Sequence, residues 1–459
     1  MYILDENSKE ALHIQLYKAL KEDIVSNYKV REKIPSIRKM ATLYNISKTT
    51  VESAYSQLYA EGFLESFPKS AYRVSDMFHK DFQADKKPIS LHTEHKVEYA
   101  YDFFPAQLTS DSFPLKLFKR LFNQNINDSL DFGSYHDGAG EIGLRNEITK
   151  YLSTSRGVTC SASQIIVCSG FSDAMGLLAK LVRQKYNYFG MEHPGYHVAR
   201  RVFEEYNYNI EKIAVKTDGI SLTDLKKSKA QIVYITPSHQ YPTGVIIPVA
   251  KRQKILEYIN SIDGLIIEDD YDSELSYYNR PIPALQGLDQ CDRVVYMGTF
   301  AKSLSPTLRV SYMVLPYHLL PLFKQSYDAH FPRVSLAIQK TLEAFLAQGH
   351  WERHVRKIRT LNKKKHNLMK KLLQDKLGES MKIIAEGGGL AILIYPSIIF
   401  DLEKLKQEAH KAKIKLYFAK DRSGGDFEAI RMGFGGFTLE ELPQAIEAFT
   451  IVWKKTIIH

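Results

Sequence analysis

At 459 residues, 44% of them hydrophobic and 25% charged, the chain has the composition of an ordinary globular protein and the length for two or three domains. Its formal net charge of +10 suggests an anionic partner, although a lysine-rich proteome would give the same number. The three cysteines do not have the spacing of a metal site or of a disulfide framework, so we expect no metal and a reducing compartment. No apolar run could form a signal peptide or cross a bilayer. We therefore expect a soluble cytoplasmic protein with no membrane partner.

Three short amphipathic helices are predicted near the N-terminus. Apolar residues recur every four positions over 12–24, and the i, i+3, i+4, i+7 pattern appears over 37–44 and again over 51–58. Ser47 is placed to cap the third helix. Two short helices joined by a three-residue turn have the geometry of a helix-turn-helix, whose second helix enters the major groove of DNA.

A two-stranded wing is predicted after these helices, from residues 62–65 and 71–74, with Lys69 near its tip. Residues 29–50 carry six basic side chains and one acidic side chain, so that one face of the module is positive and suited to salt-sensitive phosphate binding. A three-helix module used for protein contacts is the alternative from the pattern alone.

The segment IPSIRKMATLYNISKTTVESAYSQLYAEGFLES, residues 34–66, resembles the winged helix of GntR-type transcription regulators. Two features depart from that family: the wing tip is Phe67-Pro68-Lys69-Ser70 instead of a glycine-rich turn, and Glu52 stands where some relatives have an arginine. The resemblance implies contacts with DNA from Arg38, Ser47, Lys48, Thr49, Thr50 and Lys69.

The polar residues 77–100 show no sustained periodicity, and we interpret them as a linker. They would separate a winged helix-turn-helix domain over 1–76 from a larger domain over 101–459. In that larger domain, short buried-strand patterns alternate with helices, as in an α/β protein. The strand candidates are Gln164–Cys168, Tyr188–Met191, Ile232–Thr236, Leu265–Ile267 and Val294–Met297.

Polar groups follow these strands, and in an open parallel sheet ligands bind outside the carboxyl ends of the strands. The first strand is followed by a glycine turn and a helix N-terminus, which is a ready anion site. The fourth strand delivers Asp269 and Tyr271, and the fifth delivers Thr299, Lys302 and Arg309. Together these groups suit pyridoxal phosphate, because a lysine amine forms a Schiff base with its aldehyde and a carboxylate keeps its pyridine nitrogen protonated.

The segments EDDYDSE (268–274) and GTFAKSLSPTLR (298–309) resemble those of fold-type I aminotransferases, and the likeness runs from about residue 101 to the C-terminus. By this resemblance the Schiff-base lysine is Lys302, and the cofactor is also bound by Asp269, Tyr271, Tyr196, Thr299, Arg309, Gly170, Phe171 and Ser172.

Two further positions bear on the ligand. The resemblance implies that Arg431 binds the carboxylate of an amino-acid effector. Many catalytic aminotransferases have an asparagine before the Pro-Thr-Gly segment, where this chain has Tyr241, which argues against efficient transamination. We therefore do not expect enzymatic turnover as the main output.

A winged helix joined by a linker to an aminotransferase-like domain is the architecture that MocR/GabR-type regulators have. The resemblance implies a homodimer that binds pyridoxal 5'-phosphate, senses an amino acid, an amine or the cofactor itself, and binds a pair of operator half-sites in double-stranded DNA, with vitamin B6 or amino-acid metabolism under its control. Two alternatives stay open: a working aminotransferase that carries a DNA-binding module, and a regulator whose large domain has lost the cofactor and serves only for dimerisation.

Overall fold

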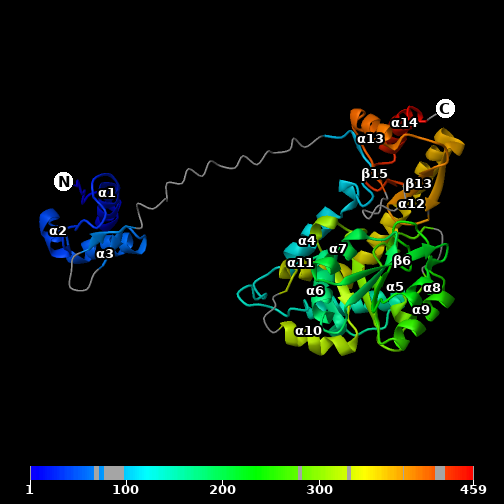
Figure 1. The fold of residues 1–459 in the computed structure, drawn as a ribbon, viewed down its shortest axis with the longest axis horizontal. Coiled ribbons are helices and arrows are strands. Elements are labelled where there is room, and N and C mark those ends of the chain that lie inside the picture. Colours follow the sequence, from blue (N-terminus) through cyan, green and yellow to red (C-terminus); the bar gives the residue numbers. More distant parts are fainter. Residues whose placement is uncertain are drawn as a thin grey trace. The chain divides into compact units, whose positions relative to one another are not determined.

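The computed structural model describes residues 2–66, 72–76, 98–277, 282–327, 332–385, 387–418 and 429–457 (Figure 1). The chain divides into two compact units, Met1–Lys96 and Val97–His459, which are described separately below. Most of the predicted linker and the predicted wing-tip residue Lys69 lie outside the described residues. Within the described part, no helix is both long enough and apolar enough to span a membrane.

The N-terminal unit contains the three predicted helices and the predicted wing. The hydroxyl of Ser36 accepts a hydrogen bond from the backbone of Lys39, and that of Ser47 accepts one from Thr50, so each helix of the pair begins at a serine cap. Asn45, in the left-handed region at φ 51°, ends the first helix of the pair. The elements are α1 (Leu12–Ser26), α2 (Ile37–Tyr44), α3 (Lys48–Ala60) and an antiparallel pair, β1 (Leu64–Glu65) and β2 (Arg73–Val74).

One apolar cluster holds this unit together. Leu16, Leu20 and Ile24 of α1 pack with Val51 and Leu58 of α3, and all five side chains are fully buried. Burying an aliphatic side chain of this size contributes about 1.5–3 kcal/mol. The apolar positions predicted from the sequence are therefore the ones that form the core. The first residues of α3 are not among them and lie at the surface.

The larger unit is built around an eight-stranded sheet with the order β4-β11-β10-β9-β8-β5-β6-β7. The strands from β10 to β6 are parallel, whereas β11 runs antiparallel to both β10 and β4, and β7 is antiparallel to β6. The strands are β4 (Ile165–Cys168), β5 (Tyr188–His193), β6 (Asn209–Lys216), β7 (Gly219–Ile220), β8 (Ile232–Ile235), β9 (Leu265–Asp269), β10 (Val294–Thr299) and β11 (Ser311–Val314).

The predicted α/β class is confirmed, and two strands are longer than their apolar runs. β9 continues to Asp269 and β10 to Thr299, because Met297 pairs with Asp269, and Thr299 pairs with Ser311. Backbone pairing does not depend on the polarity of the side chain, so an apolar run marks only part of a strand. The extension places the first polar groups of the site on the sheet itself.

Helices cover both faces of this sheet. Along β8, Ile232 and Tyr234 pack into the cluster that includes α6 and α7, whereas Val233 and Ile235 pack into the cluster with α8 and α9. Both sets of alternate side chains are buried, which explains the nearly continuous apolar runs. The α-helices of the larger unit that precede α12 in the described part of the chain are α4 (Leu115–Asn125), α5 (Ile142–Arg156), α6 (Phe171–Val182), α7 (His197–Glu205), α8 (Leu222–Lys227), α9 (Val249–Ser261), α10 (Leu320–Tyr327) and α11 (Leu336–Ala347).

A smaller antiparallel sheet, with the order β12-β13-β16-β15, forms the C-terminal part of the same unit (Figure 1). It shares an apolar core with the long helix α12 and with α14. The elements are α12 (His350–Leu377), β12 (Met381–Ala385), β13 (Ala391–Pro396), α13 (Leu402–Lys411), β15 (Tyr417–Phe418), β16 (Ile430–Gly433) and α14 (Glu441–Lys454), with β14 (Ile414–Lys415) paired in parallel with β3 (Tyr101–Asp102).

Candidate functional site

The carboxyl ends of the central strands border a cavity of about 1080 Å³. Of the residues predicted from the sequence for the cofactor and the effector, Ser172 does not line it. The cavity does include Gly170, Phe171, Tyr196, Asp269, Tyr271, Thr299, Lys302, Arg309 and Arg431. Residues far apart in the chain thus share one chamber, while the role of each stays a prediction.

Lys302 lies on the connection between β10 and β11. Its amine has a pKa lowered to about 8. Burial is the largest cause and the cation of Arg431 adds to it, while the carboxylates of Asp272 and Asp269 act in the opposite direction. A lysine must be neutral to attack a carbonyl carbon, and this environment gives a neutral fraction near physiological pH that an exposed lysine lacks.

Asp269 ends β9 and is 5% exposed. Burial raises the pKa of its carboxyl to about 7, while a hydrogen bond from the hydroxyl of Tyr234 at 2.5 Å opposes the shift. A positive charge beside this carboxylate would favour the ionised form, as a protonated pyridine nitrogen would. Tyr234, on the neighbouring strand β8, was not predicted as a site residue, because its sequence signal is that of an ordinary buried strand.

An anion cradle forms at the start of α6. Gly170, at φ 92°, is the N-cap residue, and Nη2 of Arg309 donates to the carbonyl oxygen of Ser169 at 3.3 Å. A Cβ at position 170 would lie 2.2 Å from that Nη2, so only glycine lets the guanidinium approach the helix N-terminus. Arg309 makes no ion pair with any described carboxylate. Backbone N–H groups, a helix dipole and a guanidinium together fit a phosphate.

A histidine and a carboxylate that the sequence did not single out lie beside Tyr271. Nδ1 of His239 is 2.8 Å from Oδ2 of Asp272 and 3.3 Å from the hydroxyl of Tyr271. Burial acts to lower the pKa of His239, but the charge and hydrogen bond of Asp272 outweigh it and the pKa is raised. The sequence indicated a role for Tyr241 of the same segment, but a lone loop histidine carries no comparable signal.

Tyr241 and Arg431 are in direct contact. Nη1 of Arg431 donates to the hydroxyl of Tyr241 at 2.6 Å, and the guanidinium carbon lies 4.4 Å from the centre of the tyrosine ring. The ring of Tyr196 packs edge-on against Tyr241 at 5.2 Å and against Phe171 at 5.1 Å. Three aromatic rings therefore form one wall of the cavity.

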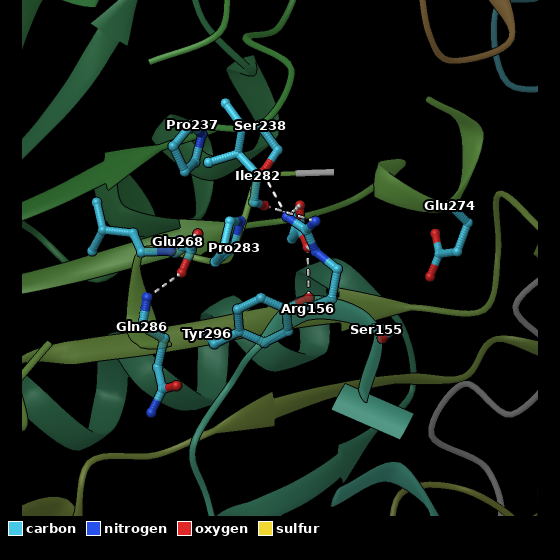
Figure 2. Close-up of polar contacts among 12 residues, drawn as sticks. Ser155, Arg156, Pro237, Ser238, Glu268, Glu274, Ile282, Pro283, Gln286 and Tyr296 are labelled. Atoms are coloured by element: carbon cyan, nitrogen blue, oxygen red, sulfur yellow. Dashed lines mark hydrogen bonds and ion pairs between the residues drawn. The ribbon is translucent and has the colours of Figure 1, made fainter. Parts of the chain in front are cut away.

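A buried arginine behind the cavity connects the loops that carry these groups (Figure 2). Nε of Arg156 is 2.6 Å from Oδ2 of Asp270, Nη2 is 2.8 Å from the hydroxyl of Ser238, and Nη1 donates to the carbonyl oxygen of Ile282 at 3.0 Å. Asp270 also accepts a hydrogen bond from Tyr296 at 2.7 Å. Because Asp270 follows Asp269 and Ser238 precedes His239 in the sequence, Arg156 holds both loops in place.

The predicted DNA-contacting residues of the N-terminal unit lie at the starts of α2 and α3. Arg38, Lys48 and Thr49 are exposed, and Thr50 is half-buried. The hydroxyl of Ser47 caps α3 and lies 2.8 Å from the hydroxyl of Thr50. An exposed helix N-terminus with a lysine and a free hydroxyl can contact phosphates and base edges.

Two family models match the chain, one in each unit. Residues 12–74 match the gntR family of bacterial regulatory proteins. Residues 106–420 match aminotransferase class I and II. The boundaries of these matches fall inside the two compact units of the fold.

Solved structures with the fold of the larger unit include aminotransferases. The kynurenine aminotransferase of Pyrococcus horikoshii, in complex with PMP, is 22% identical, with a TM-score of 0.68 over 79% of this chain and 92% of that chain. LysN, the alpha-aminoadipate aminotransferase of Thermus thermophilus, complexed with N-(5'-phosphopyridoxyl)-L-leucine, is 20% identical, with a TM-score of 0.68 over 78% of this chain and 93% of that chain. These identities show the fold alone.

Relatives that match most of the chain are named as regulators. The uncharacterized HTH-type transcriptional regulator YdeL of Bacillus subtilis is 35% identical over 96% of this chain and 97% of its own length. The "Probable rhizopine catabolism regulatory protein MocR" of Rhizobium meliloti is 31% identical over 86% and 83%. The HTH-type pyridoxine biosynthesis transcriptional regulator PdxR of Corynebacterium glutamicum is 28% identical over 79% and 78%. The chain belongs to the MocR-type HTH transcriptional regulators, which join a gntR-family helix-turn-helix to an aminotransferase class I and II domain.

Proposed function

We propose that the chain is a transcriptional regulator whose N-terminal unit binds double-stranded DNA and whose larger unit binds pyridoxal 5'-phosphate and senses a small molecule. One observation carries the cofactor assignment: a partly buried lysine whose pKa is about 8 shares a cavity with a buried aspartate and an anion cradle. Each of these features fits a different part of the same cofactor.

The residues would divide the binding as follows. Lys302 forms the covalent linkage, Asp269 binds the pyridine nitrogen, and Tyr271 donates to the ring oxygen. The start of α6, Arg309 and Thr299 at the end of β10 would hold the phosphate. Tyr196 packs on the ring. When bound, pyridoxal phosphate supplies an aldehyde that condenses with amines and a ring that withdraws electrons.

On the DNA side, Arg38, Lys48, Thr49 and Thr50 contact the duplex, and Ser47 acts mainly by capping α3. A homodimer would present two winged helices to a pair of operator half-sites. An effector then changes the affinity for DNA only if it binds one dimer conformation better than another. The effector is an amino acid, an amine or the cofactor itself, and the controlled genes belong to vitamin B6 or amino-acid metabolism.

A second function, transamination, is favoured by the presence of Lys302, Asp269 and Arg431 in one cavity. Against it, Tyr241 stands where many transaminating enzymes have an asparagine, and its hydroxyl is already engaged by Arg431. We therefore infer residual turnover at most. Formation of a keto acid from an amino donor, measured with the purified protein, would separate the two functions.

The test of the main proposal is the visible absorption spectrum of the purified protein with pyridoxal phosphate, before and after borohydride. We expect a band that borohydride removes and that Lys302→Ala lacks, while DNA binding by this variant survives. Lys254→Ala, which changes an exposed lysine of α9, is the matched control and should behave as the wild type. A borohydride-trapped adduct in Lys302→Ala would show that the cofactor is linked elsewhere.

A further inference from the structure

Arg431 is a cation whose charge is not neutralised within the described part of the protein. It projects from β16 into the cavity, and its hydrogen-bond partner is the neutral hydroxyl of Tyr241, which accepts from Nη1 at 2.6 Å. The ring of the same tyrosine lies 4.4 Å from the guanidinium carbon. The remaining N–H groups of Arg431 have no acceptor among the described residues, so they are available to a ligand.

Hydrogen bonds between neighbouring side chains and the backbone of Tyr241 fix its position. Its N–H donates to the hydroxyl of Thr236 at 3.1 Å, and its carbonyl oxygen accepts from Nε2 of Gln240 at 2.5 Å. Gln240 is fully buried and also accepts from the backbone N–H and the hydroxyl of Thr243. The phenol is therefore presented by a well-anchored loop, which limits the entropy lost when a ligand binds to it.

The hydroxyl of Tyr241 has one hydrogen left to donate. A phenol can accept and donate at the same time, and here the accepting side is used by Arg431 while no described residue accepts the hydrogen. Two adjacent groups thus offer donors without an acceptor: a neutral O–H and a guanidinium. A carboxylate has two oxygens that accept such donors together, and a charge that Arg431 would balance.

We propose that Tyr241 is a specificity-determining residue, which donates its O–H to one oxygen of a ligand carboxylate while Arg431 binds the other, so that the cavity selects amines that carry a carboxylate. This inference rests on the proposed sensor function and names the class of its ligand. An amine without a carboxylate would give neither donor an acceptor. Sites built around buried hydrogen-bond donors discriminate strongly against ligands that lack the acceptor.

Tyr241→Phe is the sharpest test, because it removes the hydroxyl and keeps the ring beneath the guanidinium. Binding would be followed by the change in the cofactor band during titration with matched pairs: glycine and methylamine, L-alanine and ethylamine, β-alanine and ethylamine, 4-aminobutyrate and propylamine. We expect the variant to bind the carboxylate member of the responsive pair about tenfold more weakly, the loss of one hydrogen bond to a charged group. Its affinity for the plain amine should change by less than about twofold.

The control is Tyr317→Phe, which removes the hydroxyl of an exposed tyrosine outside the cavity. Two results would overturn the inference. If Tyr241→Phe bound the carboxylate member as tightly as the wild type or more tightly, the phenol would be irrelevant or a competitor. If both members of a pair weakened equally, Tyr241 would have a structural role only.

A second measurement separates this inference from the proposed function. With the cofactor-free protein, propionate should raise the midpoint of thermal unfolding more than ethylammonium at the same ionic strength, and Tyr241→Phe should reduce that difference. If the wild type formed no Lys302-dependent absorption band, the proposed function would be wrong. The thermal unfolding measurement does not need the cofactor, so it would still test whether Tyr241 binds a carboxylate. No selective effect of propionate on the wild type would overturn the inference.

Discussion

The cavity and the polar network around Arg156 differ in how their charged side chains are paired, although Asp270 and Ser238 of the network directly adjoin Asp269 and His239 of the cavity in sequence. In the network, Arg156 is 4% exposed and bonds to a carboxylate, a hydroxyl and a carbonyl oxygen (Figure 2). In the cavity, Lys302, Arg309 and Arg431 make no ion pair within the described part of the chain. A buried charge is costly unless it is paired, so the ion pair and hydrogen bonds of Arg156 stabilise the fold. The unpaired cations of the cavity are available to bind an anionic ligand.

Removing the centre of the network should have the largest effect on stability. Arg156→Ala leaves Asp270 buried without its partner, and we expect the free energy of unfolding to fall by about 3–5 kcal/mol. Urea denaturation followed by circular dichroism would measure the change. A loss below about 1 kcal/mol would mean that the network does not stabilise the fold as its pairing suggests.

Removing a cavity cation should have little effect on stability and a large effect on cofactor binding. Arg309→Ala should change the free energy of unfolding by less than about 1 kcal/mol, because Arg309 is exposed and makes no ion pair with a described carboxylate. It should weaken the binding of pyridoxal phosphate about 10- to 100-fold, the loss of charge-assisted hydrogen bonds to phosphate. Spectral titration with the cofactor would measure it. Equal destabilisation by Arg309→Ala and Arg156→Ala would abolish the contrast between the two regions.

The pH dependence of cofactor loading sharpens the comparison within the cavity. Because the pKa of Lys302 is lowered to about 8, its neutral fraction grows as the pH rises toward 8, and the rate at which the cofactor band forms should rise over this range and then level off. Arg431→Gln removes a cation that lowers this pKa and should move the midpoint to higher pH. Asp272→Asn removes an anion that raises it and should move the midpoint to lower pH.

These opposite displacements can be read by stopped-flow absorption at a series of pH values. Shifts of the same sign in both variants would contradict the electrostatic account of the amine. A midpoint near the ordinary lysine value in the wild type would show that Lys302 is not in the enclosed environment described above.

The smallest effect is expected in the other unit. Lys48→Ala should weaken binding to a mixed-sequence duplex by a few-fold and reduce the slope of log affinity against log salt by about 1, as for one lost phosphate contact. The cofactor band should be unchanged. Lys18→Ala, on helix α1, is the control, since Lys18 is paired with Glu10. An unchanged slope in Lys48→Ala would place the DNA contact on other residues.

Much of the fold could be predicted because its signals are local. The period of apolar residues predicted α1, α2 and α3, and short apolar runs predicted all or part of β4, β5, β8, β9 and β10. The order of strands could not be predicted: β11 lies between β4 and β10 although β4 is far earlier in the chain, and no local pattern specifies such a pairing.

For the candidate site, ligands bind at the carboxyl ends of parallel strands, and this rule predicted from the sequence that Asp269, Lys302 and Arg309 share one site. The contacts that tune these groups were missed. Tyr234 with Asp269, His239 with Asp272, and Arg156 with Asp270 join residues 35, 33 and 114 positions apart. Such pairs have no fixed spacing, and each partner alone resembles a core tyrosine, a loop histidine or a helix-end arginine.

The connection between β10 and β11 has one more consequence. Thr299 and Ser311 pair directly across these antiparallel strands, and a two-residue turn can join such a pair, yet the chain uses residues 300–310. That stretch carries both Lys302 and Arg309. The same stretch buries Phe300, Leu304 and Val310 in the apolar core that includes β10 and β11. The segment that carries the two candidate cofactor residues is therefore also part of the core, and shortening it to a turn would remove both residues and leave a cavity beside the sheet.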